Sequence, residues 1–324
     1  MTTISATSVL ASRHAVTGDR IDTFLLRYPR CIHSEFMTHR VFSRNASSSR
    51  AIPVEKLIKD VLDDPFVPLF WGKNQKGMQA GEECSEDVEF DYEEGDGHHT
   101  YDRRAAWLKA RDHAVVMAKA FAAAGYHKQI VNRLLEPFAH ITVVVTGTQW
   151  SNFNALRNHP DAEPHIRRLA QKICAAYNDA YVQTLQPGQW HMPFVHTSWR
   201  QIEGKAPEFD GYRAIDDENY SIWRITEEEA LKLSVACCAS TSYKTVEGFN
   251  MTPERAVALH DKLVASKPLH ASPCEHQAKA DGVSWENDPA PLRSRSLQAQ
   301  NPHLGGNLGA GWIQYRKTLA GECL

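Results

Sequence analysis

The sequence lacks the features that mark several common classes of protein. Its 324 residues contain no Cys-x-x-Cys pair and no run of about 18 apolar residues, so neither a zinc ribbon nor a membrane-spanning helix is expected. The first residues lack the basic start and the apolar stretch of a secretory signal peptide. The seven cysteines are odd in number and irregularly spaced, which is typical of a reduced, cytoplasmic protein.

A strong charge of either sign is absent as well. The formal net charge is −3, with 42% hydrophobic and 23% charged residues, which is an ordinary globular composition. A protein whose main role is to coat nucleic acid is therefore not expected, although a local basic patch remains possible. The glycines at 305–309 fit neither a Walker nor a Rossmann fingerprint.

Hydrophobic patterning predicts both helices and strands. A strand is expected over 20–30, whereas the β-branched run 141–145 predicts either a buried strand or a buried helix segment. Helices are expected over 53–63, 103–124, 127–135 ending before Pro137, 161–184 beginning at Asp161, 227–238 and 252–265. Loops or irregular connections are expected over 71–79, the acidic stretch 82–98 and 187–222.

A dense group of polar side chains follows the predicted strand 20–30. The segment Thr38–Arg50 (THRVFSRNASSSR) contains three arginines, four serines and one asparagine. Arginine can fork onto phosphate oxygens, whereas serine and asparagine are indifferent helix formers that a surface helix does not require. The segment predicts a site for a small, polar, phosphorylated molecule. Taken alone, it is also compatible with side chains that cap a helix.

This segment resembles the signature of the flavin-dependent thymidylate synthases, R-H-R-x-x-S-x-N-E-x-S-x-R. The residues that match at the family's spacing are His39, Arg40, Ser43, Asn45, Ser48 and Arg50. Two positions depart from the pattern, because Thr38 replaces the first Arg and Ala46 replaces the Glu.

Further segments extend the resemblance. Residues 133–137 (RLLEP) resemble the family's R-x-x-L-P stretch, in which the Arg contacts the nucleotide. Residues 152–157 (NFNALR) resemble N-F-x-x-L-R, in which the Asn touches flavin and the Arg holds uracil. Residues 161–167 (DAEPHIR) resemble the family's H-A-Q-x-E-I helix start. Thr146 and Thr148 occupy positions that contact flavin in the family.

The last motif lies in an unexpected place. Residues 270–276 (HASPCEH) resemble the family's flavin-contacting H-x-T-P-F-E-H, which normally precedes R-H-R, and 233–243 resemble its N-terminal A-R-x-S-Y helix. The chain therefore resembles the sequence-permuted, phage-type members, with the usual N-terminal segment displaced to about 227–278. Permutation is tolerated where chain termini lie close together at the surface. Taken alone, 270–276 could also be a capping turn or a metal site with two His and one Glu, but no further cluster completes the latter.

The resemblance implies a fold and an activity. The fold is a single α+β domain over 1–324, with a central, mainly antiparallel sheet flanked by helices and an acidic loop at about 82–100. The activity is FAD-dependent methylation of dUMP to dTMP with methylenetetrahydrofolate and NADPH. The family also implies a homotetramer with shared flavin sites, in the cytoplasm or, for a phage enzyme, the host cytoplasm. Membrane association and nucleic-acid binding are not expected.

The resemblance also implies roles for individual residues. Arg157 and Ser48 are expected to be catalytic, since a guanidinium can stabilise negative charge on the uracil ring. The residues expected to bind flavin are Thr38, His39, Arg40, Asn45, Thr146, Thr148, Asn152, His270 and Ser272. Those expected to bind the nucleotide are Glu35, Ser48, Ser49, Arg50, Arg133 and Arg157. No metal and no cysteine nucleophile are expected.

Two alternatives remain open at this point. Because Thr38 and Ala46 depart from the pattern, a related flavin enzyme could make another C5-modified pyrimidine nucleotide, such as hydroxymethyl-dUMP. A non-catalytic protein could instead bind nucleotide or nucleic acid through Arg40, Arg44 and Arg50, and such binding would be sensitive to salt.

Overall fold

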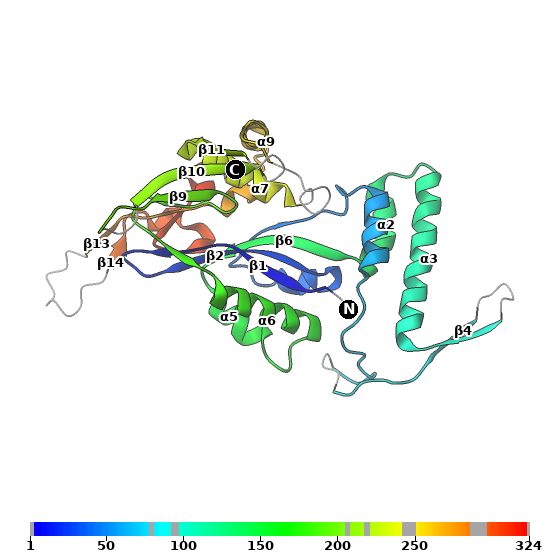
Figure 1. Cartoon of the computed structure of the whole chain (residues 1–324). Coiled ribbons are helices and arrows are strands. Elements are labelled where there is room, and N and C mark those ends of the chain that lie inside the picture. Colours follow the sequence, from blue (N-terminus) through cyan, green and yellow to red (C-terminus); the bar gives the residue numbers. More distant parts are fainter. Residues whose placement is uncertain are drawn as a thin grey trace.

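A five-stranded sheet lies at the centre of the molecule (Figure 1). The computed structural model describes residues 3–77, 81–91, 97–204, 208–216, 221–241, 251–285 and 297–322. The strand order is β3 (Ser43–Ala46), β6 (His140–Gly147), β2 (Arg20–Pro29), β1 (Ser5–His14) and β7 (Val182–Leu185). Every neighbouring pair is antiparallel except β1 and β7. The prediction of a mainly antiparallel central sheet, with a strand near 20–30, is confirmed.

Helices α5 (Trp150–Arg157) and α6 (Pro164–Asp179) cover the first face of this sheet (Figure 1). The run 141–145 is a strand, because β2 and β3 pair with it on both sides. Its alternate residues pack with Phe24 and Leu26 against the two helices. The helix expected from Asp161 begins only at Pro164, because the Glu163 carboxylate accepts two backbone N–H bonds of the first turn at 2.9 Å.

A helical unit lies beyond one end of the sheet. It contains α2 (Val54–Asp63), α3 (Arg103–Ala123), α4 (Lys128–Val131) and the 3-10 helix η2 (Asn132–Phe138). The helices predicted over 53–63 and 103–124 are confirmed. The third prediction is partly wrong: the α-helix ends at Val131, and Pro137 lies inside η2 rather than terminating a helix. The tighter 3-10 winding accommodates the proline, which has no backbone N–H to donate.

Part of the acidic stretch forms a hairpin rather than a loop. Strands β4 (Val88–Asp91) and β5 (His98–Tyr101) are antiparallel, and Phe90 stacks on Tyr101 with ring centroids 5.8 Å apart. These cross-strand aromatic contacts favour the hairpin despite the acidic composition. Residues 92–96 lie outside the described residues, as do residues 78 and 79 of the predicted polar loop 71–79.

The segment 187–222 is a second sheet region, not an irregular connection. It contains β8 (Trp190–His191), β9 (His196–Arg200), β10 (Glu208–Asp216) and β11 (Ser221–Ile225), of which β9, β10 and β11 form an antiparallel sheet. Helices α7 (Glu227–Ala239) and α9 (Pro253–Ala265) pack against it. Both predicted helix starts are confirmed, since Thr226 forms a capping box with Glu229 and Thr252 caps α9. Positions 242 and 243 of the helix expected over 233–243 lie outside the described residues.

The C-terminal segment covers the second face of the central sheet. Its elements are η3 (Ser272–Glu275), β12 (Ala278–Ala280), β13 (Val283–Trp285), β14 (Leu297–Ala299), η4 (Pro302–Leu304), η5 (Gly306–Leu308), β15 (Trp312–Gln314) and η6 (Tyr315–Thr318). Fully buried Trp312 packs with Ile21 of β2 and Leu185 of β7. Among the helices of the described residues, none combines the length and apolar character needed to span a bilayer.

A line of buried hydrogen bonds crosses this second face. Gln183 of β7 donates its Nε2 hydrogen to Ser12 Oγ of β1 at 3.0 Å. Ser12 Oγ also bonds His191 Nδ1 at 2.8 Å, and His191 Nε2 bonds Thr23 Oγ1 of β2 at 2.9 Å. Because His191 comes from β8, the line already joins the central sheet to a segment that follows it in sequence.

The same line continues to the far side of the sheet. Thr23 Oγ1 bonds Thr146 Oγ1 of β6 at 2.6 Å, and Thr146 Oγ1 bonds His276 Nδ1, just after η3, at 2.8 Å. We call these six residues the buried polar chain: Gln183, Ser12, His191, Thr23, Thr146 and His276. Burial lowers the pKa of His191 and of His276 to about 3, so both rings are neutral at physiological pH.

These two histidines should make the protein sensitive to acid. Their folded pKa lies below the ordinary value of about 6.5, so the unfolded chain takes up protons first as the pH falls. The free energy of unfolding should decrease by on the order of 1 kcal/mol per histidine for each pH unit below about 6.5. Urea unfolding between about pH 7 and pH 5 measures this slope. His191→Gln should make the slope shallower than in the wild type, whereas His159→Gln, at an exposed position, should leave it unchanged. Equal slopes in all three proteins would contradict the assignment.

Candidate functional site

The C-terminal end of α5 brings Arg157 against α1 (His33–Phe36) and the turn that follows it. Arg157 Nε donates to His39 Nε2 at 2.8 Å, and Nη2 donates to Thr38 Oγ1 at 3.2 Å. Arg157 Nη1 forms an ion pair with Glu35. We call Glu35, Thr38, His39 and Arg157 the Arg157 cluster. Residues expected to bind flavin and residues expected to bind nucleotide therefore meet here.

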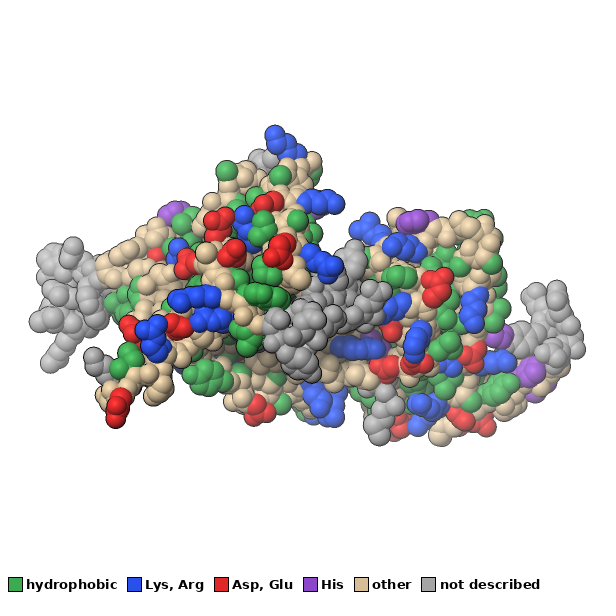
Figure 2. Space-filling view, turned by 45° about the horizontal axis from the view of Figure 1, so that its top comes forward, with side chains coloured by type: hydrophobic (Ala, Val, Ile, Leu, Met, Phe, Trp, Pro, Cys, Tyr) green, Lys and Arg blue, Asp and Glu red, His purple; other side chains and the backbone are tan. Residues whose placement is uncertain are grey.

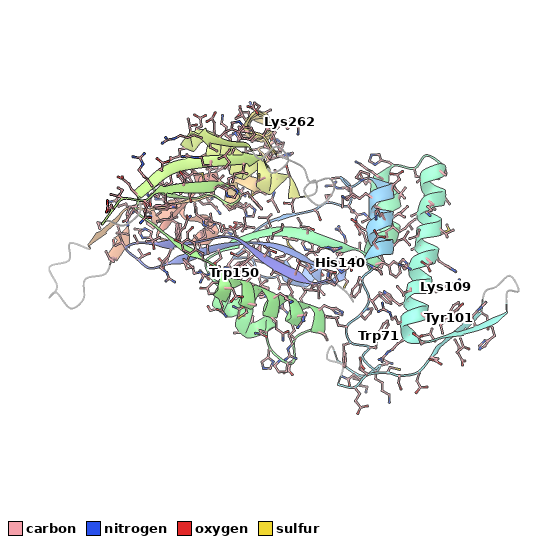
Figure 3. The ribbon with its side chains drawn as sticks, viewed as in Figure 1. Trp71, Tyr101, Lys109, His140, Trp150 and Lys262 are labelled. Carbon is pink, nitrogen blue, oxygen red and sulfur yellow. The ribbon has the colours of Figure 1, made fainter. Side chains whose placement is uncertain are left out.

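Aromatic packing fixes the backbone beneath the cluster. Phe42 stacks on Trp150 with centroids 4.3 Å apart, and Phe153 lies edge-on to His39 at 4.9 Å. Trp150 lies at the start of α5, close below the central sheet (Figure 3). A Cβ at Gly147 would come within 2.6 Å of the Phe42 ring, so only glycine allows β6 to pass this closely.

The charges of the Arg157 cluster allow the anionic oxygen of a ligand to replace the Glu35 carboxylate. Burial, together with the charges of Arg157 and Arg44, lowers the pKa of His39, so the ring is neutral and Nε2 can accept from Arg157. Arg157 and Glu35 are 20% and 30% exposed, so their ion pair is within reach of a ligand. An anionic oxygen of a ligand could take the place of the Glu35 carboxylate on this guanidinium.

A second cluster forms around Glu136 of η2. Its carboxylate accepts from Ser49 Oγ at 2.7 Å and from Arg133 Nη1 at 3.2 Å, and it pairs with Arg30 at 3.2 Å. We call Ser49, Arg133, Glu136 and Arg30 the Glu136 cluster. Ser49 and Arg133, two residues expected to bind nucleotide, thus lie together. Sequence reasoning missed Arg30, although its place directly after the strand β2 was a usable signal.

The remaining predicted residues near this cluster are Ser48 and Arg50, which flank Ser49. Arg50 is exposed. Glu136 stands where the R-x-x-L-P pattern has leucine, so here a carboxylate occupies a position between two guanidinium groups. Two arginines and a hydroxyl that converge on one carboxylate can equally receive a phosphate group.

Residues 270–276 lie against β3. In the orientation that satisfies its neighbours, the Asn45 side-chain nitrogen donates to the Ser272 backbone oxygen at 3.2 Å. His276 Nε2 lies 3.4 Å from the same amide, and His276 Nδ1 bonds Thr146. Residues 270–276 therefore lie beside β3, at the end of the segment 38–50, although they follow it by more than 200 residues in the chain.

The other residues expected near flavin fall into two groups. Arg40, Asn152, His270 and Ser272 are exposed. Thr146 is fully buried in the buried polar chain, and Thr148 donates its hydroxyl hydrogen to the Leu308 carbonyl at 3.0 Å. The Thr146 side chain therefore supports His276 rather than facing a ligand, because it lies on the covered second face of β6.

The exposed group has the chemistry that a flavin requires. Its guanidinium, amide, imidazole and hydroxyl groups can donate to ring carbonyls and to a diphosphate. These donor types are compatible with FAD. Within the ranges that the structure describes, no group of three or more His, Cys, Asp and Glu side chains is placed to hold a metal ion.

Comparison with known proteins gives little further information about the roles of these residues. No protein-family profile and no curated protein sequence matches the chain. Among solved structures, the UMP/dUMP methylase PolB from Streptomyces cacaoi bound with 5-Br dUMP is 16% identical, with a TM-score of 0.39 over 54% of this chain and 90% of that chain. The same methylase bound with 5-Br UMP has the same identity and TM-score over 55% and 89%. Because this similarity is low, the activity has to be inferred from the residues of the chain itself.

Thr146→Val should test the link between β6 and His276. The change keeps the shape of the side chain but removes the hydroxyl that bonds Thr23 and His276. The free energy of unfolding should fall by about 1–3 kcal/mol, because two buried polar groups lose a partner. Thr184→Val on β7, at an exposed strand position, is the matched control and should change it far less. Equal effects in urea unfolding would count against a structural role for the Thr146 hydroxyl.

Proposed function

We propose that the protein is a FAD-dependent thymidylate synthase of the sequence-permuted type, which methylates dUMP to dTMP with methylenetetrahydrofolate and NADPH. The observation that supports this proposal is the meeting of motif segments that are remote in sequence. Residues 35–39 meet Arg157, Ser49 meets Arg133 through Glu136, and Asn45 meets Ser272. If these residues only capped helices, there would be no reason for the segments expected to bind flavin and nucleotide to be the ones in contact.

In this proposal, Arg157 holds the uracil base. A uracil oxygen takes the place of the Glu35 carboxylate on its guanidinium. The guanidinium then stabilises the negative charge that makes C5 nucleophilic. Neutral His39 orients the guanidinium through the Nε hydrogen bond, so that the other nitrogens face the base. Ser48 is proposed to contact the same uracil base and to take part in the reaction there.

The Glu136 cluster is proposed to bind the 5′-phosphate. Arg30, Arg133 and the Ser49 hydroxyl already point at one carboxylate, and Arg50 adds an exposed positive charge next to them. Phosphate binding would displace Glu136 or bridge to it through these donors. The Glu136 substitution in R-x-x-L-P then keeps the arginines in position when no nucleotide is bound.

A bound, reduced FAD would supply the hydride that turns the transferred methylene into a methyl group. Its proposed binding residues are Arg40, Asn152, His270 and Ser272, with His39 and Asn45 behind them. We include the homotetramer with shared flavin sites in the proposal, because exposed binding residues can be completed by a second subunit.

One alternative product remains to be distinguished. Thr38, which departs from the family pattern, lies inside the Arg157 cluster, where its hydroxyl donates to the Glu35 carbonyl at 2.7 Å and accepts from Arg157. A change at this place could alter the reaction at C5, for example toward hydroxymethyl-dUMP. Mass spectrometry of the nucleotide product separates the two outcomes.

The nucleic-acid alternative is disfavoured by Arg44. Its guanidinium is turned inward and donates to the carbonyl oxygens of Phe36 at 3.2 Å and His39 at 3.0 Å. On the face shown in Figure 2, basic and acidic side chains are interspersed rather than gathered by sign. A polynucleotide groove would require a continuous basic strip.

Arg157→Ala provides the test of the proposed activity. With dUMP, methylenetetrahydrofolate and NADPH, dTMP formation should fall by roughly 100-fold or more, because the charge on the ring loses its stabilising partner. The visible absorption of bound FAD should persist. Arg168→Ala on α6, whose side chain is exposed, is the control and should retain activity. Wild-type protein that binds no FAD on titration, or an Arg157→Ala variant with full activity, would overturn the proposal.

A further inference from the structure

Three arginine side chains meet on the sheet of β9, β10 and β11, which carries no residue of the Arg157 cluster or the Glu136 cluster. Arg200 lies on β9, Arg213 on β10 and Arg224 on β11. Arg200 Nη2 and Arg213 Nη2 donate to the Asp210 carboxylate at 2.8 and 2.7 Å. Arg224 Nη2 donates to the backbone oxygen of Asp210 at 2.9 Å. We call these four residues the Asp210 cluster.

A β-bulge in β10 makes this arrangement possible. The register of β10 against β9 shifts between Phe209 and Gly211, so Asp210 is an extra residue on β10. Gly211 has a φ of 118°, which favours glycine. A Cβ at this position would lie 3.5 Å from Arg213 Nη1 and 3.6 Å from Arg224 Nη2. The bulge therefore brings two guanidinium groups close to its own backbone, and bulges of this kind often redirect side chains next to functional sites.

The Asp210 cluster contains more positive charge than it neutralises. Arg213 stands directly opposite Arg224 in the register of β10 and β11, and like charges in this arrangement destabilise a sheet. The hydrogen bond from Arg200 lowers the pKa of Asp210, so its carboxylate is ionised at neutral pH. Within the described ranges, Asp210 is the carboxylate that forms ion pairs with these guanidinium groups. Even when Glu208, which stands opposite Arg200, is included, the positive charges outnumber the negative ones.

The position of Arg224 indicates which kind of anion would fit. Its guanidinium is exposed, and the acceptor that the structure describes for it is a neutral backbone oxygen. Each of the two carboxylate oxygens of Asp210 already accepts from another arginine. A guanidinium binds an anionic oxygen more strongly than a neutral one. A phosphate group offers three such oxygens in a tetrahedral arrangement, whereas a planar carboxylate offers two.

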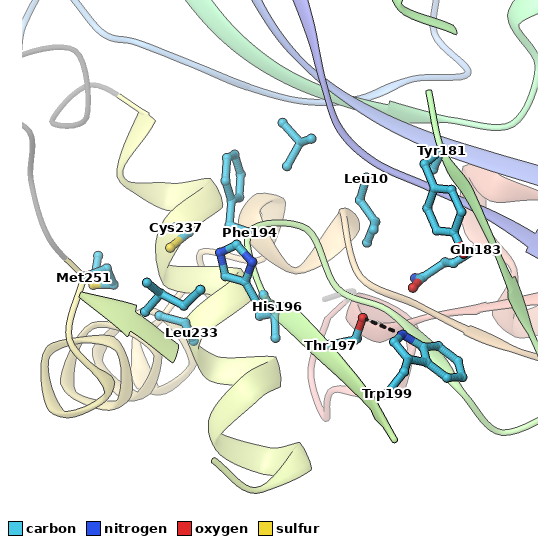
Figure 4. Close-up of a pocket in the computed structure, with 14 residues that line it drawn as sticks. Leu10, Tyr181, Gln183, Phe194, His196, Thr197, Trp199, Leu233, Cys237 and Met251 are labelled. Carbon is cyan, nitrogen blue, oxygen red and sulfur yellow. Dashed lines mark hydrogen bonds between the residues drawn. The ribbon is translucent and has the colours of Figure 1, made fainter. Parts of the chain in front are cut away.

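The cavity beside β9 is a separate feature with different chemistry. It has a volume of about 520 Å³, and Thr197 and Trp199 of β9, joined by a hydrogen bond at 3.3 Å, line it (Figure 4). Because side chains alternate along a strand, Ser198 and Arg200 point to the opposite face, and neither lines the cavity. Of the described residues that line it, none is Asp, Glu, Lys or Arg. A charged ligand is therefore expected on the open face of the sheet, where Arg200 is 68% exposed.

We propose that the Asp210 cluster binds the dianionic phosphate group of a small phosphate monoester. Each of the three guanidinium groups donates to one phosphate oxygen, while the Asp210 carboxylate keeps Arg200 and Arg213 in position. The bound phosphate offsets the repulsion between Arg213 and Arg224. The inference does not depend on the proposed methylation, because the Asp210 cluster shares no residue with the sites assigned to dUMP and FAD.

The test titrates inorganic phosphate and ribose 5-phosphate into the full-length protein by calorimetry, with chloride added to keep the ionic strength constant. Wild-type protein should bind at least one probe with a Kd below about 10 mM, and the tighter probe distinguishes free phosphate from an organic phosphate. Arg224→Gln should weaken this binding by roughly tenfold, because it removes one charge-assisted hydrogen bond and leaves the ion pairs of Asp210 in place. Arg224→Lys, which keeps the charge but loses the fork, should weaken it less.

Two further variants are the controls. Arg168→Gln removes an equal charge from the exposed face of α6 and should leave phosphate binding unchanged. Arg133→Gln removes a guanidinium from the Glu136 cluster, so any phosphate bound there is weakened while binding at the Asp210 cluster survives. Circular dichroism of each variant checks the fold.

Three results would overturn the inference. The first is that neither probe binds wild-type protein at concentrations up to about 10 mM, and binding of oligothymidylate in their place would assign the surface to a polynucleotide. The second is that Arg168→Gln weakens binding as much as Arg224→Gln does, which would indicate a general effect of charge. The third is that binding is lost in Arg133→Gln but survives Arg224→Gln, which would place the phosphate at the Glu136 cluster. Failure of the methylation test with phosphate binding intact would affect only the proposed function.

Discussion

The buried polar chain is the constraint on which the rest of the structure depends. Four strands of the central sheet place hydroxyl and amide side chains in one line, and two neutral imidazole rings join them. Each neutral ring can donate through one nitrogen and accept through the other, so both nitrogens of His191 and of His276 have a use in these bonds. Because all these groups are buried, removal of one partner leaves another unsatisfied in a place that water does not reach.

This constraint also positions the candidate site. His276 follows η3 and fixes residues 270–276 against β3, next to Asn45. Thr146, its partner, lies on β6, and β6 leads through Gly147 into α5, which carries Arg157. The proposed flavin-binding and base-binding elements are therefore connected to the same strand. At its other end the chain reaches Gln183 on β7, at the edge of the sheet.

Local signals explain which predictions from the sequence were successful. The strand near 20–30 and the helix starts at Thr226 and Thr252 depend on alternation and capping, which are readable in one segment. The two segments that the resemblance linked, 38–50 and 270–276, are in contact at Asn45. The sheet within 187–222 was missed because proline, glycine and aromatic residues interrupt its alternation. Arg30 was missed because its partner Glu136 comes from a distant segment that only the folded chain brings next to it.

The order of the chain has a consequence for its synthesis. Strands β1, β2 and β6 can pair once the ribosome has released residue 147, and their first face is covered when α6 follows. The hydroxyls of Ser12 and Thr23 then wait for His191, which follows α6 closely, whereas the Thr146 hydroxyl waits for His276, which is made much later. A protein truncated before residue 276 would therefore leave the Thr146 end of this polar stripe without its partner.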